Sequence, residues 1–236
     1  MVRLSWAIER PGHPSLGSEI ALLAGVAPIG IKLGTLADLE GTVDAMIDFS
    51  HPVATLELAG FCRDRAIPLV VGTTGFSSAQ RAELDQAAGT IPLLVSPNMS
   101  RAVNLLMHLV AEAAHALGQA ADIEIVERHH RMKKDAPSGT ALRLAEIAAN
   151  ATGISHFVHG REGQVGERPH NEIGLHAVRA GDVPGEHTII FGLPGESLEL
   201  CHRAINRDGF VRGAIEAARF LAGKPPGHYH MSDLSS

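Results

Sequence analysis

Apolar residues in the first hundred positions form short runs that alternate with helix-length segments. Between positions 2 and 8 every second residue is apolar, which predicts a strand that ends just before Glu9. Continuous apolar runs predict buried strands at 43–49, 68–71 and 91–95, with a shorter strand at 29–33. Each run is the right length for one strand and too short for a helix.

The segments between these strands have recognisable helix ends. Pro52 is tolerated only in a first helical turn, so it opens a helix that runs to about residue 64. Ser77 and Gln80 form a capping-box pattern for a helix that Gly89 closes, and a helix at 103–117 stops at Gly118. Strands and helices that alternate in this way predict an α/β fold with a parallel, Rossmann-like sheet.

Three segments directly follow predicted strands: Glu9, positions 72–74 and positions 96–98. Parallel sheets bind ligands at the carboxyl ends of their strands, so these segments are candidates for a binding edge. For the glycine-containing segment at 72–75 the alternative is an ordinary turn followed by a helix cap.

The second half of the chain has a different pattern. Strand-like runs at 172–179, 187–192 and 197–204 are joined by short Gly/Pro turns at 181–185 and 194–195. Such turns predict antiparallel hairpins, and hence a second, α+β domain with a mixed or antiparallel sheet. Helices are predicted at 139–150 and 209–223, the latter with Ile215, Phe220 and Leu221 on its apolar side, and 224–236 reads as a polar tail.

Composition narrows the function classes. The 236 residues hold 20 Lys and Arg against 26 Asp and Glu, so the formal charge of -6 argues against a nucleic-acid partner. No apolar run approaches the ~18 residues that a membrane span requires. Cys62 and Cys201 lie in a predicted helix and a predicted strand, where we expect small buried side chains in a protein of the reducing cytoplasm.

The candidate chemistry is concentrated at 127–140, between a strand at 123–126 and the helix that follows. This stretch contains His129, His130, four Lys or Arg residues and a Ser-Gly-Thr sequence. Ser138 is a plausible N-cap, and the free N–H groups beyond it favour a carboxylate or a phosphate. The alternative is a solvated basic loop. A metal site is not expected, because adjacent strand residues point to opposite faces and no further ligand group accompanies the two histidines.

The same stretch strongly resembles the signature of the 4-hydroxy-tetrahydrodipicolinate (dihydrodipicolinate) reductases, E-x-H-H-x-x-K-x-D-A-P-S-G-T-A, at every fixed position. Further agreement lies at 47–50 (I-D-F-S), 72–76 (G-T-T-G-F), 161–168 (R-E-G, then G-E-R) and 179–187 (R-A-G-D, then G-E-H). The resemblance covers nearly the whole chain. It implies reduction of a cyclic dicarboxylate in lysine and diaminopimelate biosynthesis.

The resemblance also implies roles for individual residues. His129 and Lys133 are the candidate acid–base and proton-donating residues, and the residues alone do not separate the two. The substrate carboxylates would be held by His130, Ser138, Gly139 and Thr140. A cofactor, NADH or NADPH, would contact two loops and the neighbouring residues Glu9 and Arg10. The loops consist of Gly72, Thr73 and Thr74, and of Ser96, Pro97, Asn98 and Met99. Glu9 and Arg10 leave the choice of cofactor open, because Glu9 suits the ribose of NADH and Arg10 the phosphate of NADPH.

On this resemblance, residues 1–100 form the dinucleotide-binding domain, completed by 205–236, and residues 101–204 form the substrate-binding and oligomerisation domain of a homotetramer. Family members begin with a strand, a G-x-x-G-x-M-G loop and a helix before the segment aligned with Glu9, so we expect the working protein to be longer. Without that strand, the strands at 2–8 and 43–49 would lack their shared partner. The alternative is a non-catalytic or cofactor-deficient fragment that only oligomerises or binds dicarboxylates.

Overall fold

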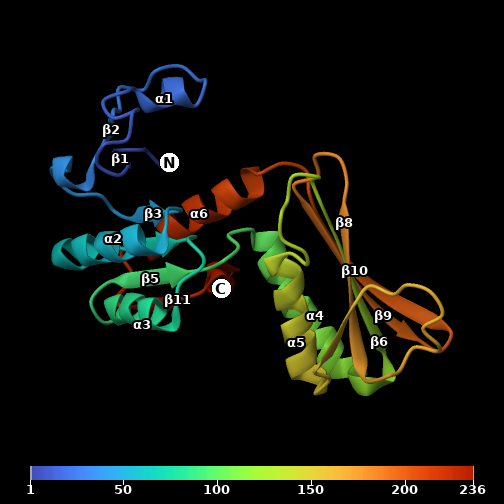
Figure 1. Ribbon diagram of the computed structural model, residues 1–236. Coiled ribbons are helices and arrows are strands. Elements are labelled where there is room, and N and C mark those ends of the chain that lie inside the picture. The colour runs from blue at the N-terminus through green and yellow to red at the C-terminus, as the bar shows by residue number, and fades with distance from the viewer. Residues whose placement is uncertain (1, 236) are drawn as a thin grey trace. The chain divides into compact units, whose positions relative to one another are not determined.

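The structure is a computed structural model that describes residues 2–235, and it divides into two compact units. One unit contains the chain up to Pro97 together with the segment from Gly213 onward, and the other is Asn98–Arg212. Figure 1 labels their elements. A parallel sheet in the first unit and a mixed sheet with helices in the second confirm the predicted α/β fold class.

The first unit is built on a four-stranded parallel sheet with the strand order β11-β5-β4-β3. Its elements are β3 (Met46–Asp48), α2 (Pro52–Arg65), β4 (Leu69–Val71), α3 (Ser78–Gln86), β5 (Pro92–Val95), most of α6 (Asp208–Leu221) and β11 (Gly227–Tyr229), with short 3-10 turns η1 (Leu36–Asp38), η2 (Ala87–Gly89) and η4 (Met231–Ser235). Buried strand side chains such as Leu69, Val71 and Leu93 form its core with Cys62 and Leu84 from the helices.

The helix ends in this unit are those that the sequence predicts. Pro52 lies at the first position of α2, after His51 as N-cap. Ser77 caps α3, and both hydrogen bonds of the capping box with Gln80 are present. These signals are local, because the side chain and the backbone group it satisfies lie within one turn.

The predicted first strand is much shorter in the structure. Only β1 (Ala7–Ile8) is formed, and it pairs in parallel with β2 (Leu33–Gly34) in a separate two-stranded sheet. The short helix α1 (Ile20–Leu23) lies between these two strands in the sequence. Within residues 2–235, β3 is therefore an edge strand of the main sheet. The prediction that the strand at 43–49 is fully buried is wrong at three positions, because Asp44, Ile47 and Phe49 are exposed, the last two by 41% and 59%.

The C-terminal segment is not the polar tail that its composition predicts. Its residues Gly227–Tyr229 form β11, which pairs in parallel with β5, and Met231 beyond it is buried. The Tyr229 ring packs edge-on against Phe220 at 5.6 Å between centroids. A three-residue strand is too short to give a periodic signal, so only its pairing identifies it.

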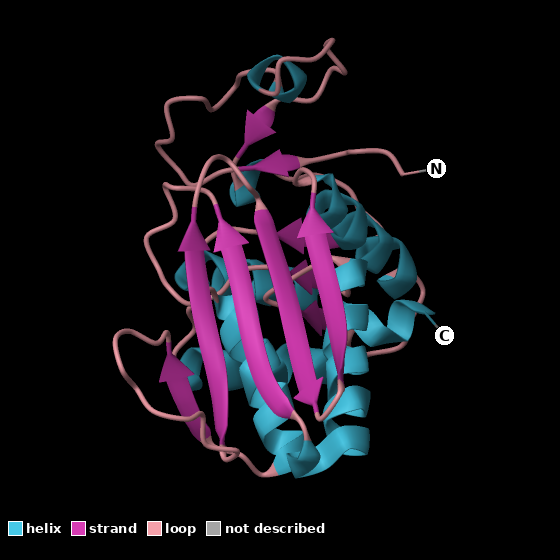
Figure 2. Cartoon of the chain, turned by 90° about the vertical axis from the view of Figure 1, so that its right-hand side faces the viewer, coloured by secondary structure: helices cyan, strands magenta, loops and turns pink. Residues whose placement is uncertain are grey.

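The second unit is a five-stranded mixed sheet with the order β10-β9-β6-β8-β7. The strands are β6 (Asp122–His129), β7 (His156–His159), β8 (Glu172–Arg179), β9 (Gly185–Leu193) and β10 (Glu196–Ala204), with helices α4 (Arg101–Leu117) and α5 (Gly139–Thr152) and the short turn η3 (Gly118–Ala120). Figure 2 shows the long strands side by side with helices behind them. The buried core lies between α4, α5 and this covered face of the sheet.

The predicted hairpin across the turn at 181–185 is wrong. Strands β8 and β9 are not neighbours, because β6 lies between them, parallel to β8 and antiparallel to β9. The connection at 180–184 instead crosses the end of β6, where the His130 N–H donates to Val183 O and the Ala180 N–H donates to His129 O. The other predicted hairpin, β9 with β10, is confirmed. The crossing connection holds the predicted functional stretch in place.

The two cysteines are free and differ in environment. Cys62 is fully buried as predicted, and burial, followed by the charge of Asp48, raises the pKa of its thiol to about 12. Cys201 is exposed, so the prediction is wrong there, because alternate side chains of the edge strand β10 point away from the helices. Within residues 2–235, no helix is both long and apolar enough to cross a bilayer.

Candidate functional site

The last three residues of β6 place two polar side chains on the helix-covered face of the sheet. Glu127 and His129 are two residues apart on the strand, so they point the same way. They are 1% and 8% exposed. The His129 Nδ1 lies 2.6 Å from Glu127 Oε2. A buried histidine in contact with a buried carboxylate therefore ends the central strand.

Two further groups hold the Glu127 carboxylate. Arg179, at the end of β8, donates from Nη1 to Oε2 at 2.8 Å and from Nη2 to Oε1 at 2.7 Å, and the backbone N–H of Ser138 donates to Oε1 at 3.0 Å. Burial raises the pKa of Glu127, but hydrogen bonds from Arg179, His129 and Ser138 outweigh it and bring the pKa below its usual range. Glu127 is therefore an ionised carboxylate inside the protein.

Ser138 is the N-cap of α5, as the sequence predicts. Its Oγ accepts from the Ala141 N–H at 3.2 Å, and the side chain is 2% exposed. The helix starts at Gly139, and Thr140 Oγ1 accepts from Asn98 Nδ2 at 3.3 Å. The first turn of α5 thus has free N–H groups of the kind for which the sequence predicts an anion-binding role.

His187, on β9, completes the cluster. The sequence alone indicates no role for this residue. Its Nε2 lies 3.1 Å from Ser138 Oγ, and its ring packs edge-on against His129 at 5.2 Å between centroids. Burial, followed by the charge of His129, lowers the pKa of His187 to about 4. His187 is therefore neutral near pH 7, and its Nδ1 is buried without a partner among residues 2–235.

Lys133 lies in the turn after β6. Its backbone N–H donates to His130 O at 3.1 Å, which closes the turn, and its Nζ forms an ion pair of 2.8 Å with Asp135. The Lys133 charge also contributes to the lowered pKa of His187, so the ammonium lies in the electrostatic field of the histidine cluster. His130 is half-buried in the same turn. The structure thus brings the predicted acid–base and carboxylate-binding residues to one end of β6.

In the first unit, the carboxyl ends of β4 and β5 carry the other predicted loops. The Gly72 N–H donates to Asp48 O at 2.8 Å, and the Ser96 N–H donates to Val71 O at 3.0 Å, so the two loops begin side by side. An added Cβ at Gly72 would lie 2.2 Å from the Phe49 ring, which explains why this position has no side chain.

Asp48 fixes the first of these loops and had been given no role from the sequence. This buried carboxylate accepts from Thr73 Oγ1 at 2.8 Å, from Ser50 Oγ at 2.6 Å and from Thr55 Oγ1 at 2.5 Å. The buried Thr73 hydroxyl therefore already donates its proton to Asp48, whereas Thr74 is exposed.

The remaining predicted cofactor residues are less uniform. Pro97 is exposed, but Met99 is 1% exposed, so its side chain is packed inside the protein. Glu9 follows β1 in the two-stranded sheet rather than a strand of the main sheet, and its Oε1 accepts from the Arg10 N–H at 2.8 Å. Within residues 2–235 no cluster of three or more His, Cys, Asp or Glu could hold a metal ion.

The first unit is a parallel α/β unit with glycine and hydroxyl groups at its strand ends. The second is a mixed-sheet unit with a histidine cluster at a helix start. This combination is typical of Rossmann-like oxidoreductases that have a second unit for an anionic ligand. The sequence model for the N-terminus of dihydrodipicolinate reductase matches residues 1–99, and the model for its C-terminus matches residues 102–234. The chain belongs to the dihydrodipicolinate reductase family.

Individual relatives agree with this assignment. The chain is 46% identical over 239 residues to the 4-hydroxy-tetrahydrodipicolinate reductase of Anaeromyxobacter sp. (strain Fw109-5), covering 99% of this chain and 88% of that protein. It is 47% identical over 234 residues to the reductase of the same name from Alkalilimnicola ehrlichii, covering 97% and 87%. A dipicolinate-bound dihydrodipicolinate reductase from Paenisporosarcina sp. TG-14 has the same fold, with a TM-score of 0.74 at 24% identity over 96% of this chain and 87% of that one.

Proposed function

We propose that this chain reduces dihydrodipicolinate, which forms when 4-hydroxy-tetrahydrodipicolinate loses water, to tetrahydrodipicolinate with NADH or NADPH, in lysine and diaminopimelate biosynthesis. The observation that carries the proposal is the cluster at the end of β6. There His129 contacts Glu127, which also accepts from the Ser138 N–H at the start of α5, and Lys133 lies in the turn that follows the strand. Relatives that cover nearly the whole chain are 4-hydroxy-tetrahydrodipicolinate reductases.

The residues of the second unit match the needs of a doubly negative ring. The first-turn N–H groups at Gly139 and Thr140, with the Ser138 cap and the imidazole of His130, would hold the carboxylates. Reduction adds a hydride and a proton across a conjugated C=C–C=N system. Lys133 would donate the proton, and His129 would act beside it as the acid–base residue or as a balancing charge. In this role Lys133 must exchange its Asp135 partner for the substrate.

The loops of the first unit fit the nicotinamide end of the cofactor. When bound, the cofactor supplies the hydride. The backbones of Gly72 and Ser96 begin adjacent loops at the carboxyl end of the parallel sheet, where such folds bind a nicotinamide ring, and the exposed Thr74 hydroxyl offers a hydrogen bond. The adenosine end is assigned to Glu9 and Arg10, which leaves both NADH and NADPH as cofactors.

This assignment gives each unit a task. The sheet-and-loop unit that includes β3, β4, β5 and β11 would bind the dinucleotide, and the mixed-sheet unit would bind the substrate. The cytoplasm, where reduced dinucleotides and free thiols are maintained, is the proposed location.

The direct test is substrate-dependent oxidation of NADH and of NADPH by the purified chain, with dihydrodipicolinate generated in the assay. The proposal predicts turnover with at least one cofactor. Cofactor binding measured without substrate separates the alternative of a cofactor-deficient fragment, which would bind dipicolinate but neither NADH nor NADPH. Dipicolinate binding without either binding or oxidation of a cofactor would contradict the reductase assignment.

We also propose that copies of the chain associate through the uncovered face of the five-stranded sheet into the homotetramer that the resemblance implies. This face carries Val126, Val178 and Ile190, of which Val178 is 41% exposed, and no helix of the second unit packs on it (Figure 2). Sedimentation of the wild type should give a tetramer, and Ile190→Lys should shift it to smaller species. A monomeric wild type would contradict this part of the proposal.

A further inference from the structure

The Glu127 carboxylate connects three separate elements of the second unit. It contacts His129 on its own strand, Arg179 at the end of β8 and the backbone of Ser138 at the start of α5. We propose that Glu127 is a positioning residue that keeps the His129 proton on Nδ1 and so presents Nε2 to the substrate, with Arg179 holding the carboxylate in place. This inference rests on the proposed function and adds a residue to it.

The hydrogen-bonding partners determine which ring nitrogen carries the proton. An ionised carboxylate only accepts hydrogen bonds, so a nitrogen 2.6 Å from Glu127 Oε2 must be a donor. Two guanidinium nitrogens of Arg179 contact the two carboxylate oxygens and keep Glu127 charged. Neutral His129 consequently has its proton on Nδ1 and its lone pair on Nε2.

The opposite side of the His129 ring faces Gly185 on β9. The Nε2 makes no hydrogen bond to another group within residues 2–235, and Gly185 beside it has no side chain. An added Cβ at Gly185 would lie 3.0 Å from Nε2 and 3.4 Å from Cδ2. A glycine at this position therefore leaves Nε2 the room that a reacting ring requires.

The third contact relates the histidine to the anion-binding helix start. The Ser138 N–H donates to Glu127 Oε1, while Oε2 of the same carboxylate contacts His129. A single planar group therefore sets the spacing between the acid–base imidazole and the first turn of α5. A side chain with only one acceptor oxygen cannot satisfy both contacts and Arg179.

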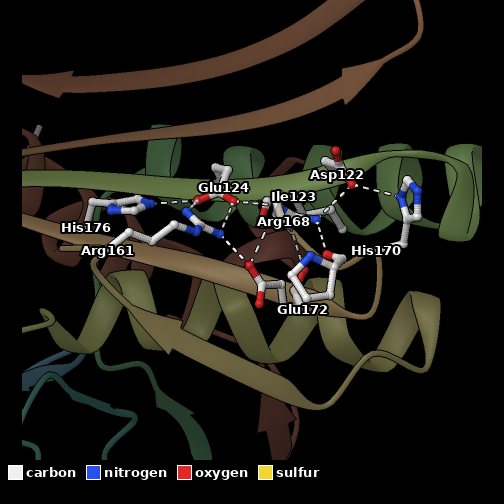
Figure 3. Close-up of polar contacts among 9 residues, drawn as sticks. Asp122, Ile123, Glu124, Arg161, Arg168, His170, Glu172 and His176 are labelled. Atoms are coloured by element: carbon white, nitrogen blue, oxygen red, sulfur yellow. Dashed lines mark hydrogen bonds and ion pairs between the residues drawn. The ribbon is translucent and has the colours of Figure 1, made fainter. Parts of the chain in front are cut away.

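A second carboxylate on β6 provides a matched control. Glu124 lies three residues earlier on the uncovered face and accepts from Arg161, from Arg168 and from His176 (Figure 3). It has the same partner types as Glu127, but none of the candidate catalytic or substrate-binding residues is among them. Loss of this carboxylate removes a charged network from the same strand without touching the proposed chemistry.

The test compares Glu127→Gln with Glu124→Gln in the purified full chain. In Glu127→Gln the single amide oxygen is drawn to the Ser138 N–H and Arg179, which places the amide NH₂ against His129 Nδ1 and moves the ring proton to Nε2. Nitrogen-15 spectra of the imidazoles should therefore show an Nδ1–H tautomer for His129 in the wild type and an Nε2–H tautomer in the variant. The turnover number should fall on the order of 10²-fold, with substrate KM changed less than about threefold.

Glu124→Gln should keep the wild-type His129 tautomer and the wild-type turnover number per folded molecule. Glu127→Asp, which restores a carboxylate, should recover the Nδ1–H tautomer and part of the activity. An unchanged His129 tautomer in Glu127→Gln, or an equal loss of turnover in Glu124→Gln, would overturn the inference. An inactive wild type that still shows the Nδ1–H tautomer would instead reject the proposed function and leave the positioning role intact.

Discussion

Glu124 and Glu127 lie three residues apart on one strand, and each accepts hydrogen bonds from arginine and histidine side chains. They nevertheless belong to different regions of the molecule. Glu124 is on the uncovered face of the sheet, where Arg161, Arg168 and His176 surround it. Glu127 is on the covered face with Arg179 and His129. Both carboxylates have a lowered pKa, that of Glu124 about 2, because hydrogen bonds from their partners outweigh the effect of burial.

The difference lies in what each network is attached to. The Glu124 network ties Arg161 and Arg168, in the loop before β8, to β6 and to Glu172 on β8, as Figure 3 shows, and it contains none of the candidate catalytic or substrate-binding residues. The Glu127 network lies at the end of β6, beside a helix N-terminus and the turn that carries Lys133. We therefore expect function at the Glu127 cluster, because it adjoins the end of the fold where we propose that the ligand binds. The predictions below separate the two regions.

Lys133→Ala should have the largest effect. Removal of a proton donor lowers turnover by about 10²- to 10⁴-fold, while cofactor affinity is kept because the lysine lies outside the cofactor loops. Steady-state kinetics and NADH binding measure the two quantities. Lys134→Ala, an exposed neighbour in the same turn, is the control and should keep its turnover. Unchanged turnover in Lys133→Ala would remove this residue from the mechanism.

His187 should make the covered cluster sensitive to mild acid. Its pKa is about 4 in the folded protein against 6.5 ordinarily. Between pH 6.5 and pH 4 this histidine is therefore protonated in the unfolded chain but not in the folded protein. The free energy of unfolding should fall by about 3 kcal/mol as the pH drops from 6.5 to 4. Urea denaturation across this range should show a much smaller pH dependence in His187→Gln. An equal dependence in the variant would show that another group is responsible.

The Glu124 network should act in a lower pH window. Its folded pKa of about 2 lies below the ordinary 4.5, so its stabilisation is present above pH 4.5 and is lost as the pH falls toward 2. Glu124→Gln should lower the free energy of unfolding at pH 7 by about 1–3 kcal/mol and flatten the loss of stability below pH 4.5. Thermal or urea unfolding at pH 3 and pH 7 measures both effects. A stability equal to the wild type at pH 7 would mean that the network is only a surface ion pair.

Gly185→Ala should have the smallest effect and should act on the covered cluster alone. The added methyl would lie 3.0 Å from His129 Nε2, so the imidazole must move by a few tenths of an ångström. We expect turnover to fall about tenfold. Gly192→Ala, near the other end of the same strand, meets its nearest neighbour at 3.8 Å and serves as the control. Equal turnover in both variants would show that Nε2 needs no free space.

Local features were predictable from the sequence. The start of α2 at Pro52, the caps at Ser77 and Ser138 and the bounds of β8 follow from residues within one turn or one strand. The pairing of β6 between β8 and β9 did not follow, because the Gly/Pro turn at 181–185 has the chemistry of a hairpin and gives no sign of an inserted strand. Strand β11 was missed for a similar reason, since its stability comes from β5 rather than from its own sequence.

The candidate site shows the same division. His129, Lys133 and Ser138 stand out in one continuous motif. The roles of Arg179 and His187 depend on strand pairing, because β8 and β9 flank β6 and bring these residues to Glu127 and Ser138 from about 50 positions away. Both residues lie in segments that resemble the family, so a signal was present, but nothing within those segments identifies the partner of either residue.

The most direct test of the contrast between the two regions is a dipicolinate titration followed in imidazole nitrogen-15 spectra, with signals assigned from single His→Gln variants. Binding at the covered cluster should shift the signals of His129 and His130. It should leave unchanged those of His176, which contacts Glu124, and of His170, which contacts Asp122 at the start of β6. Shifts confined to His170 and His176, with His129 and His130 unaffected at saturating dipicolinate, would contradict the account.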